Sequence, residues 1–196
     1  MCGIAGILNL QSGAPVRTPE LAAMLDPLAS RGPDGRGTYL EEPEQLGLAH
    51  ARLSIIDLAG GAKPIHNEDQ SIWISYNGEV FNYVELRAEL EKAGHRFYTD
   101  TDTEVIVHLY EEHGLRFVEQ LNGQFAIALW DKPQRRLVLA RDRAGILPLF
   151  HAREPRCHVR FGHVAQAVLA LPPGESRGRR AEGTRPVDGG AAAHAA

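Results

Sequence analysis

The chain has 196 residues, of which 43% are hydrophobic and 23% charged, and it carries a formal net charge of −4, so one substantial hydrophobic core is expected. Residues 1–150 are acidic on balance, no apolar run approaches the roughly 18 residues of a membrane span, and neither a secretory signal nor the cysteine spacing of a disulfide framework or a zinc site is present. We therefore expect a cytoplasmic protein with no nucleic acid or membrane partner and no metal site.

The N-terminal part of the chain predicts short strands around one helix. Residues 4–8, 46–51 and 53–58 are apolar runs typical of strands. Thr18-Pro19-Glu20 predicts the start of a helix, because a capping residue precedes a proline that is compatible with the first turn. The glycines and the proline of residues 31–35 indicate a loop. The apolar face of the helix is formed by four residues at helical spacing: Leu21, Met24, Leu25 and Leu28.

The middle of the chain predicts one strand, one turn and two helices. Residues 71–76 alternate between apolar and polar side chains, as in a strand with one buried face. The Asn77-Gly78 pair that follows is typical of a tight turn. Helices are expected over about 83–93 and 103–113, each ended by a glycine. Residues 101–104 begin the second helix with the Thr-x-x-Glu pattern of a capping box.

The C-terminal part predicts further strands and then a change in character. Residues 124–130 and 136–141 are expected to pair, and a third strand is expected near 149–151. The order of the predicted elements is hairpins, then two adjacent helices, then hairpins again. This order indicates an α+β protein with mostly antiparallel sheet covered by helices. From residue 172 the chain is too poor in large apolar side chains to offset its ordering entropy. We therefore expect a folded domain over residues 1–171 and a disordered low-complexity tail over 172–196.

Cys2 is the candidate nucleophile. Removal of Met1 would leave a thiol and a free α-amino group on one residue. A thiol attacks as its thiolate, and an α-amino group with a pKa of roughly 7.7–8.0 can take the proton near neutral pH. His50 is a second possible base, but the α-amino group makes one unnecessary, so a structural His50 is expected. The alternative is that Cys2 is an ordinary small residue near a strand end.

Six short segments carry a resemblance to a known family. They are Cys2-Gly3-Ile4-Ala5-Gly6, Arg31-Gly32-Pro33-Asp34-Gly35, His50-Ala51-Arg52-Leu53-Ser54-Ile55, Tyr76-Asn77-Gly78-Glu79-Val80-Phe81-Asn82, Asp102-Thr103-Glu104-Val105 and Ala140-Arg141-Asp142-Arg143. In this order they resemble the class II glutamine amidotransferase domain, and more narrowly the N-terminal glutaminase half of glutamine-dependent asparagine synthetase. The resemblance implies an N-terminal nucleophile hydrolase fold, a four-layer αββα sandwich. It also implies hydrolysis of glutamine to glutamate and ammonia through a cysteine thioester.

The resemblance also implies roles for five further residues. It assigns the oxyanion hole to the Asn77 side chain and the Gly78 backbone N–H. It assigns the α-carboxylate of glutamine to Arg52 and the α-ammonium to Asp102, with Glu79 as a second acceptor. These residue types suit the task, because a desolvated substrate charge needs a partner and a guanidinium binds a carboxylate through two donors. The alternatives are a plain turn for Asn77 and Gly78, a surface position for Arg52 and Glu79, and a helix N-cap for Asp102.

The sequence departs from the family beyond about residue 150. Leu147 stands where the family usually has a lysine, and residues 161–168 replace a stretch that usually contains a Ser-Glu pair. No synthetase domain follows, so ATP and magnesium would belong to a domain outside this sequence, and no cofactor is expected here. Ammonia would pass to a separate synthetase, to another acceptor protein or to water.

Three functions remain open at this point. The first is a glutaminase domain of asparagine-synthetase type, which the intact set of site residues favours. The second is a truncated, catalytically idle remnant or a binding module of the same fold. The third is the glutaminase domain of another class II enzyme, such as glucosamine phosphate synthase or an amidophosphoribosyltransferase. The wording of residues 31–35 and 53–58 favours the asparagine-synthetase branch over the third.

Overall fold

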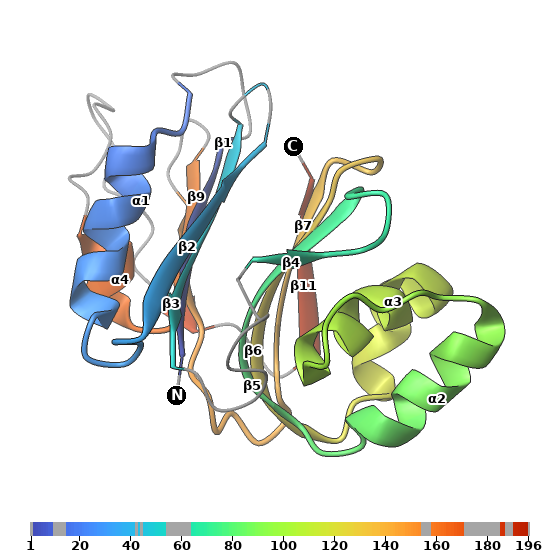
Figure 1. The fold of residues 1–196 in the computed structure, drawn as a ribbon. Coiled ribbons are helices and arrows are strands. Elements are labelled where there is room, and N and C mark those ends of the chain that lie inside the picture. Colours follow the sequence, from blue (N-terminus) through green and yellow to red (C-terminus); the bar gives the residue numbers. More distant parts are fainter. Residues whose placement is uncertain are drawn as a thin grey trace.

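The protein is built from two facing β-sheets with helices on both outer sides (Figure 1). The structure, a computed structural model, describes residues 2–9, 15–41, 43, 45–53, 64–153, 158–170, 185–186 and 190–195. Each pairing between strands in these residues is antiparallel. The predicted α+β class and the four-layer αββα sandwich are therefore confirmed. Within the same residues, no helix combines the length and apolar character that a membrane crossing requires.

The first sheet contains the N-terminal strand and has the strand order β10-β8-β9-β1-β3-β2. Its outer face is covered by α1 (Thr18–Leu25), a short 3-10 turn η1 (Asp26–Leu28) and α4 (Ala165–Leu169). The strands predicted near residues 4–8 and 46–51 are present, whereas β2, β9 and α4 were not predicted. The strands of this sheet are β1 (Gly3–Asn9), β2 (Gly35–Leu40), β3 (Leu46–Arg52), β8 (Phe150–Arg153), β9 (His158–Gly162) and β10 (Arg185–Pro186).

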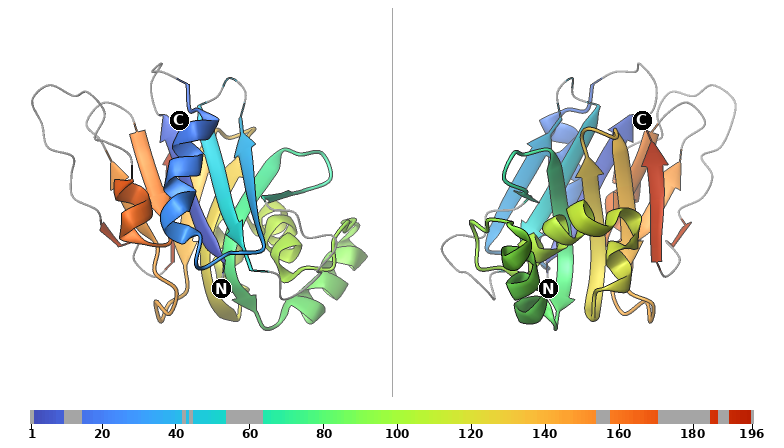
Figure 2. Two further views of the ribbon diagram at one scale, coloured as in Figure 1. Left: turned by 60° about the vertical axis from the view of Figure 1, so that its left-hand side comes forward. Right: turned by 90° about the vertical axis from the view of Figure 1, so that its right-hand side faces the viewer.

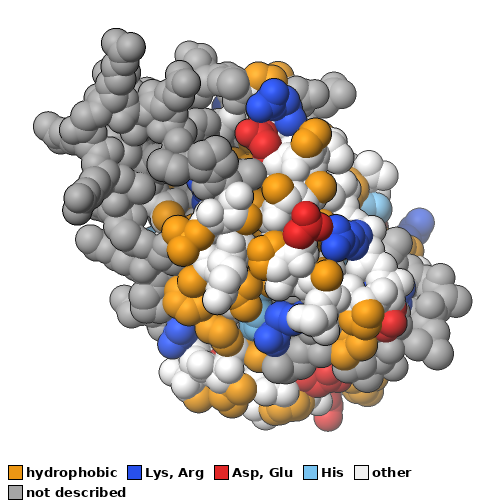
Figure 3. All heavy atoms as spheres, turned by 90° about the vertical axis from the view of Figure 1, so that its left-hand side faces the viewer, with side chains coloured by type: hydrophobic (Ala, Val, Ile, Leu, Met, Phe, Trp, Pro, Cys, Tyr) orange, Lys and Arg blue, Asp and Glu red, His pale blue; other side chains and the backbone are white. Residues whose placement is uncertain are grey.

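Helix α1 packs on the first sheet through the face that its sequence predicts. Three of the four predicted apolar residues lie in α1 and Leu28 lies in η1, and all four are buried and contact β1 and β3 through a shared core. The helix begins one residue earlier than the Thr18 cap suggests, since Arg17 is the N-cap and its backbone N–H donates to Glu20 Oε2 at 2.8 Å. Figure 3 shows this outer side of the molecule, where basic and acidic side chains are interspersed. Arg36 and Asp26 form an ion pair of 2.9 Å.

The second sheet has the order β11-β7-β6-β5-β4 and is covered by α2 (Tyr83–Ala93), α3 (Asp102–His113) and the 3-10 helix η2 (Gly114–Glu119). Both predicted helices are confirmed, and α2 ends where Gly94 takes the left-handed conformation with φ 109°. The predicted 53–58 strand lies almost wholly outside the described residues. The strands of this sheet are β4 (Ile65–His66), β5 (Ile72–Val80), β6 (Gly123–Asp131), β7 (Arg136–Arg141) and β11 (Gly190–Ala195).

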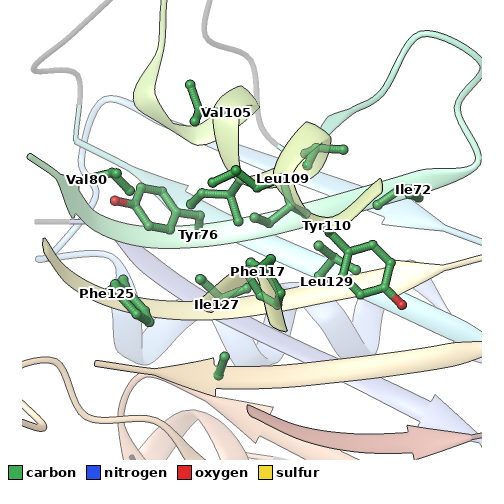
Figure 4. Packing of buried hydrophobic residues seen from close by; sticks show 14 of the residues in the cluster. Ile72, Tyr76, Val80, Val105, Leu109, Tyr110, Phe117, Phe125, Ile127 and Leu129 are labelled. Carbon is green, nitrogen blue, oxygen red and sulfur yellow. The ribbon is translucent and has the colours of Figure 1, made fainter. Parts of the chain in front are cut away.

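Two cores hold the second sheet in place. One lies between this sheet and the helices, where Ile72, Ile74 and Tyr76 of β5 pack with α3 and η2 (Figure 4). The other lies between the two sheets and joins apolar residues of β1 and β3 to those of β6 and β7. Both faces of the second sheet are therefore buried, and the burial of β6 and β7 is nearly continuous along each strand rather than alternating.

The tight turn predicted at Asn77-Gly78 is wrong. Strand β5 continues through both residues to Val80, and Gly78 lies opposite Phe125 of β6. A Cβ atom on Gly78 would lie 2.2 Å from the Gln124 carbonyl oxygen, and one on Gly123 would lie 2.1 Å from the Glu79 carbonyl oxygen. Glycine is thus required here because β5 and β6 approach closely, and not because the chain reverses. The long pairing with β6 overrides the local preference of an Asn-Gly pair.

Part of the C-terminal tail forms strands, where the sequence predicts disorder. Residues 190–195 make β11, which pairs with the edge of β7, and residues 185–186 make β10, which pairs with β8. Figure 2 shows β11 as the red strand at this edge. An open edge offers unpaired backbone groups, and pairing with them requires no large side chains. The other tail residues lie outside the described part of the chain.

Candidate active site

Cys2 lies at the start of β1, beside the end of β3. Gly3, the next residue, is paired with Ala51. The backbone N–H of Leu53 lies 3.4 Å from Cys2 Sγ, and the thiol is directed at the Leu53 carbonyl oxygen at 3.6 Å. Cys2 is a free cysteine and is half-buried. Its sulfur is therefore held by the backbone of the residue that follows β3, while Cys2 stays partly open to solvent.

Arg52 is brought to the same end of the first sheet by β3. It is half-buried, it lies opposite Gly35 of β2, and its carbonyl accepts a hydrogen bond of 3.0 Å from the Asp34 N–H. The loop that carries Asp34 packs tightly here, since a Cβ on Gly32 would lie 2.2 Å from the Ala51 carbonyl carbon. Two of the six family-like segments, 31–35 and 50–55, thus meet beside Cys2.

Asn77 connects the second sheet to the first. It is 1% exposed, and its Nδ2 lies 3.1 Å from Nδ1 of His163, which is also 1% exposed. The backbone N–H of His163 donates to the Ile4 carbonyl at 2.9 Å, so His163 links Asn77 to β1 near Cys2. Burial, together with the positive charge of Arg31, lowers the pKa of His163 to about 4. A neutral ring can accept a hydrogen bond from the Asn77 amide and thereby orient it.

Gly78 and Glu79 continue β5 toward Val80. Gly78 lies opposite Phe125, whose backbone is clamped by Asp142: the Phe125 N–H donates to Asp142 Oδ2 at 3.2 Å and the Asp142 N–H donates to the Phe125 carbonyl at 3.0 Å. Burial by itself raises the pKa of Asp142, but backbone donors, including the Ile146 N–H at 3.0 Å, outweigh it and lower the pKa. The ionised Asp142 therefore fixes the strand next to Gly78.

Asp102 ties helix α3 to the same stretch of β5. It is the first residue of α3 and is 5% exposed. Its Oδ2 accepts hydrogen bonds from the Tyr76 hydroxyl at 2.9 Å and from the Val80 N–H at 3.0 Å. These two donors flank Asn77, Gly78 and Glu79 in the chain, so Asp102 lies against the segment that carries them.

Tyr76 shows that groups from both sheets are close together. Burial raises the pKa of its phenol well above the usual value, followed by the negative charge of Asp102 and, to a smaller extent, by Glu79 and Cys2. One phenol thus lies within electrostatic reach of the candidate nucleophile and of both candidate acceptors for the substrate ammonium.

The capping box predicted at residues 101–104 is wrong. Thr101 is the N-cap of α3, but its side chain makes no capping hydrogen bond. The Glu104 carboxylate accepts hydrogen bonds from the Tyr98 N–H at 2.8 Å and from the Thr99 N–H at 2.7 Å. Glu104 thus orders the segment before the helix, and the Thr101 N–H donates to the Thr99 hydroxyl at 3.3 Å instead.

Sequence reasoning missed two residues of this region and set a third aside. The strand pattern marks Tyr76 only as a core residue. His163 lies in residues 161–168, which stand out in the sequence only because they differ from the family. His50, expected to be structural, is fully buried, and its Nδ1 lies 3.3 Å from Ser75 Oγ, which donates to the Ala49 carbonyl at 3.0 Å. These contacts join the two sheets and fit a structural role.

Comparison with known proteins identifies relatives over most of the chain. Asparagine synthetase [glutamine-hydrolyzing] 2 of Bacillus subtilis (strain 168) is 47% identical over 156 residues, which cover 77% of this chain and 20% of that protein. Asparagine synthetase [glutamine-hydrolyzing] 3 of Arabidopsis thaliana is 41% identical over 150 residues, which cover 76% of this chain and 25% of that protein. The chain therefore spans about a fifth to a quarter of the length of these relatives.

A solved structure shows that the fold is shared more widely. The glutamine phosphoribosylpyrophosphate (PRPP) amidotransferase from B. subtilis, complexed with ADP and GMP, superimposes with a TM-score of 0.74 at 18% identity, over 99% of this chain and 49% of that one. The fold is accordingly that of the N-terminal nucleophile amidotransferases. The family model of the glutamine amidotransferase domain matches residues 1–180, and the chain belongs to that family, with the N-terminal glutaminase half of asparagine synthetase as its counterpart among the relatives compared.

Proposed function

We propose that the chain hydrolyses glutamine to glutamate and ammonia, with Cys2 as the nucleophile once Met1 has been removed. The observation that carries the proposal is the gathering of groups from both sheets around the start of β1. The first sheet supplies Cys2 and Arg52, and the second supplies Asn77, Gly78 and Glu79, with Asp102 bonded to the same strand. Each group has a counterpart in the chemistry of the substrate.

The reaction requires no base other than the α-amino group of Cys2. The sulfur attacks the side-chain amide carbon of glutamine, and the α-amino group accepts the thiol proton. It then passes a proton to the leaving nitrogen, so that ammonia departs and a thioester remains. Water adds to the thioester, glutamate leaves, and the thiol regains its proton.

Asn77 and Gly78 are proposed to stabilise the oxyanion that forms in both steps. Removing one such donor costs about 2.7–4 kcal/mol in a studied hydrolase. The contact with His163 supports this role for Asn77, because an amide that is already oriented loses less entropy when it binds the transition state. The close β5–β6 pairing supports it for Gly78, because it holds the backbone in one position.

Arg52, Glu79 and Asp102 are proposed to bind the amino-acid end of glutamine. The Arg52 guanidinium pairs with the α-carboxylate, and the two carboxylates face the α-ammonium. Asp102 Oδ2 already accepts two hydrogen bonds, whereas Oδ1 has a long contact of 3.4 Å from the Thr103 hydroxyl. Oδ1 is therefore the oxygen proposed to receive the ammonium.

The destination of the ammonia is proposed by analogy with the relatives. Because these are named as glutamine-hydrolysing asparagine synthetases, we propose a synthetase site, or another acceptor protein, as the partner that consumes it. ATP and magnesium would act at that partner site. The nucleophile must be a reduced thiol, which suits a reducing compartment such as the cytoplasm.

The direct test measures glutamate and ammonia released from glutamine by the purified chain, with intact-mass analysis of its N-terminus. Cys2→Ala is expected to lose at least about 1,000-fold in rate, as expected for loss of a nucleophile. Cys157→Ala, which changes the other cysteine of the sequence, is the matched control and should retain the parent rate. Retention of Met1 in an active protein, or equal rates for the parent and Cys2→Ala, would contradict the mechanism.

A further inference from the structure

A cluster of histidine and glutamate side chains lies in the helical layer over the second sheet. It combines Glu68, from the turn between β4 and β5, His95, which follows α2, and two residues one helical turn apart on α3, His108 and Glu111. One nitrogen or oxygen atom from each residue can be chosen so that all four lie within 4.8 Å of one another. Three separate segments of the chain therefore converge on one small volume.

The spacing of these atoms is close to that of a tetrahedral metal site. His108 Nδ1 lies 2.8 Å from Glu111 Oε2 and 3.6 Å from Glu68 Oε2. His95 Nδ1 lies 3.6 Å from Glu111 Oε2 and 3.8 Å from Glu68 Oε1. Tetrahedral zinc with bonds of about 2.0–2.2 Å separates its ligand atoms by about 3.3–3.6 Å. The observed separations lie on both sides of this value, so small rotations of the side chains suffice.

The surroundings of the cluster orient these atoms toward one another. His95 Nε2 lies 3.0 Å from Glu112 Oε1, and His108 Nε2 lies 3.6 Å from Glu104 Oε1. A carboxylate thus faces the outer nitrogen of each ring, as is usual for histidines that bind a metal through the other nitrogen. Glu111 Oε1 accepts a hydrogen bond of 2.8 Å from Asn67 Nδ2, which leaves Oε2 for the cluster.

Charge and access also suit a divalent ion. Two ionised glutamates and two neutral imidazoles carry a charge of −2, which a divalent cation neutralises, and a neutral group is much less costly to bury. The His108 side chain is fully buried, whereas 38% of the Glu68 side chain and 24% of the Glu111 side chain are exposed. An ion can therefore enter from the solvent side and reach the buried histidine.

We propose that Glu68, His95, His108 and Glu111 bind one divalent transition-metal ion of the zinc type. Imidazole nitrogen with carboxylate oxygen is a donor set that suits zinc, and four protein ligands make a closed, structural site rather than a catalytic one. The ion would cross-link the β4–β5 turn and the segment after α2 to helix α3. The expectation of no metal site rested on cysteine spacing, which does not bear on a histidine and glutamate site.

The competing state of the cluster is a proton in place of the metal. Burial alone would lower the pKa of His108, but the Glu104 carboxylate 3.6 Å from its Nε2, the hydrogen bond of its Nδ1 to Glu111 and the surrounding negative charges raise the pKa to about 9. Without a metal, His108 is then an imidazolium held between carboxylates, and a metal must displace its proton. The experiment has to distinguish these two states.

The test is a titration of the purified, chelator-treated full chain with Zn²⁺ alone at pH 7.5, followed by competition with a chromophoric chelator and by elemental analysis after dialysis. We expect about one ion per chain and a rise in thermal unfolding temperature on binding. His95→Ala and Glu111→Gln should each weaken binding at least about 100-fold, and Glu112→Gln, which loosens the outer nitrogen of His95, about 10-fold or more.

The controls separate this site from other zinc ligands and from loss of the fold. His113→Ala removes an exposed histidine of the same helix that lies outside the cluster and should keep the parent affinity. The Cys2→Ala, Cys157→Ala double variant excludes binding by thiols and should also bind one ion. Circular dichroism shows whether each variant is folded. Absence of tight binding by the folded parent, or unchanged affinity in folded His95→Ala and Glu111→Gln, would overturn the proposal and leave the protonated cluster.

Discussion

Replacement of Gly78 by alanine tests whether the close approach of β5 and β6 shapes the proposed active site. The new Cβ would lie 2.2 Å from the Gln124 carbonyl oxygen and 2.8 Å from the Phe125 Cα. Both neighbours are backbone atoms, and an ordinary contact needs about 3.4–4 Å. The two strands must therefore separate by more than 1 Å at this point. Overpacking of this kind costs typically about 1–3 kcal/mol of stability.

The same displacement should affect catalysis more than stability. It would move the Gly78 N–H and the Asn77 side chain, and loss of one correctly placed oxyanion donor costs about 100- to 1,000-fold in kcat. We expect a Gly78→Ala protein that folds, unfolds at lower urea concentration than the parent, and hydrolyses glutamine at least about 100-fold more slowly.

The assay compares urea unfolding and glutamine hydrolysis for Gly78→Ala, the parent and a matched control. Gly35→Ala is the control for stability, since its Cβ would meet only the Arg52 Cβ at 4.0 Å among the atoms considered. It should change the free energy of unfolding by less than about 0.5 kcal/mol. If Gly78→Ala were as stable and as active as the parent, the close approach of the strands would have no part in the site.

Three further predictions concern residues around Gly78. Asn77→Ala should lower kcat about 100- to 1,000-fold with little change in KM, because the lost donor acts on the transition state; steady-state kinetics would refute this if KM alone changed. Asp102→Asn keeps an acceptor for Tyr76 but removes the charge, so KM for glutamine should rise about 10- to 100-fold, and an unchanged KM would remove Asp102 from the substrate site. The pKa of His163 is lowered in the folded protein, so the unfolded chain binds a proton at this histidine first as the pH falls. The free energy of unfolding should therefore decline by up to about 3 kcal/mol between about pH 6.5 and pH 4. Urea unfolding between pH 7.5 and 4 should show a smaller decline in His163→Gln, and an identical decline would show that His163 does not cause it.

Where local signals were strong, sequence-based expectations were accurate. Helix α2 ends at Gly94 as predicted, because glycine adopts the left-handed conformation without steric cost. The apolar face of α1 and the buried face of β5 follow directly from spacing along the chain. Both depend on residues within a few positions of one another, which a linear pattern can express.

Expectations were wrong where a distant segment competed with a local preference. Asn77 and Gly78 are typical of a turn, yet nine paired positions with β6 keep the chain extended through them. Thr101 and Glu104 have the spacing of a capping box, yet Glu104 binds the backbone before the helix. In the tail, residues 190–195 have no large apolar side chains, yet backbone pairing with the edge of β7 makes them a strand.

The candidate chemical groups of this protein can be predicted from its sequence alone. They are a cysteine next to Met1, an arginine, an asparagine, a glycine and two acids, in the order of a known family. Their assembly cannot be predicted in this way. Cys2 meets Leu53 across 51 positions, and Asn77 meets His163 across 86. Glu68 and His95 join His108 and Glu111 only because a turn, the end of one helix and the face of another pack together. Contacts between residues so far apart produce no repeating pattern in the sequence, because they depend on how the sheets and helices pack in the tertiary structure.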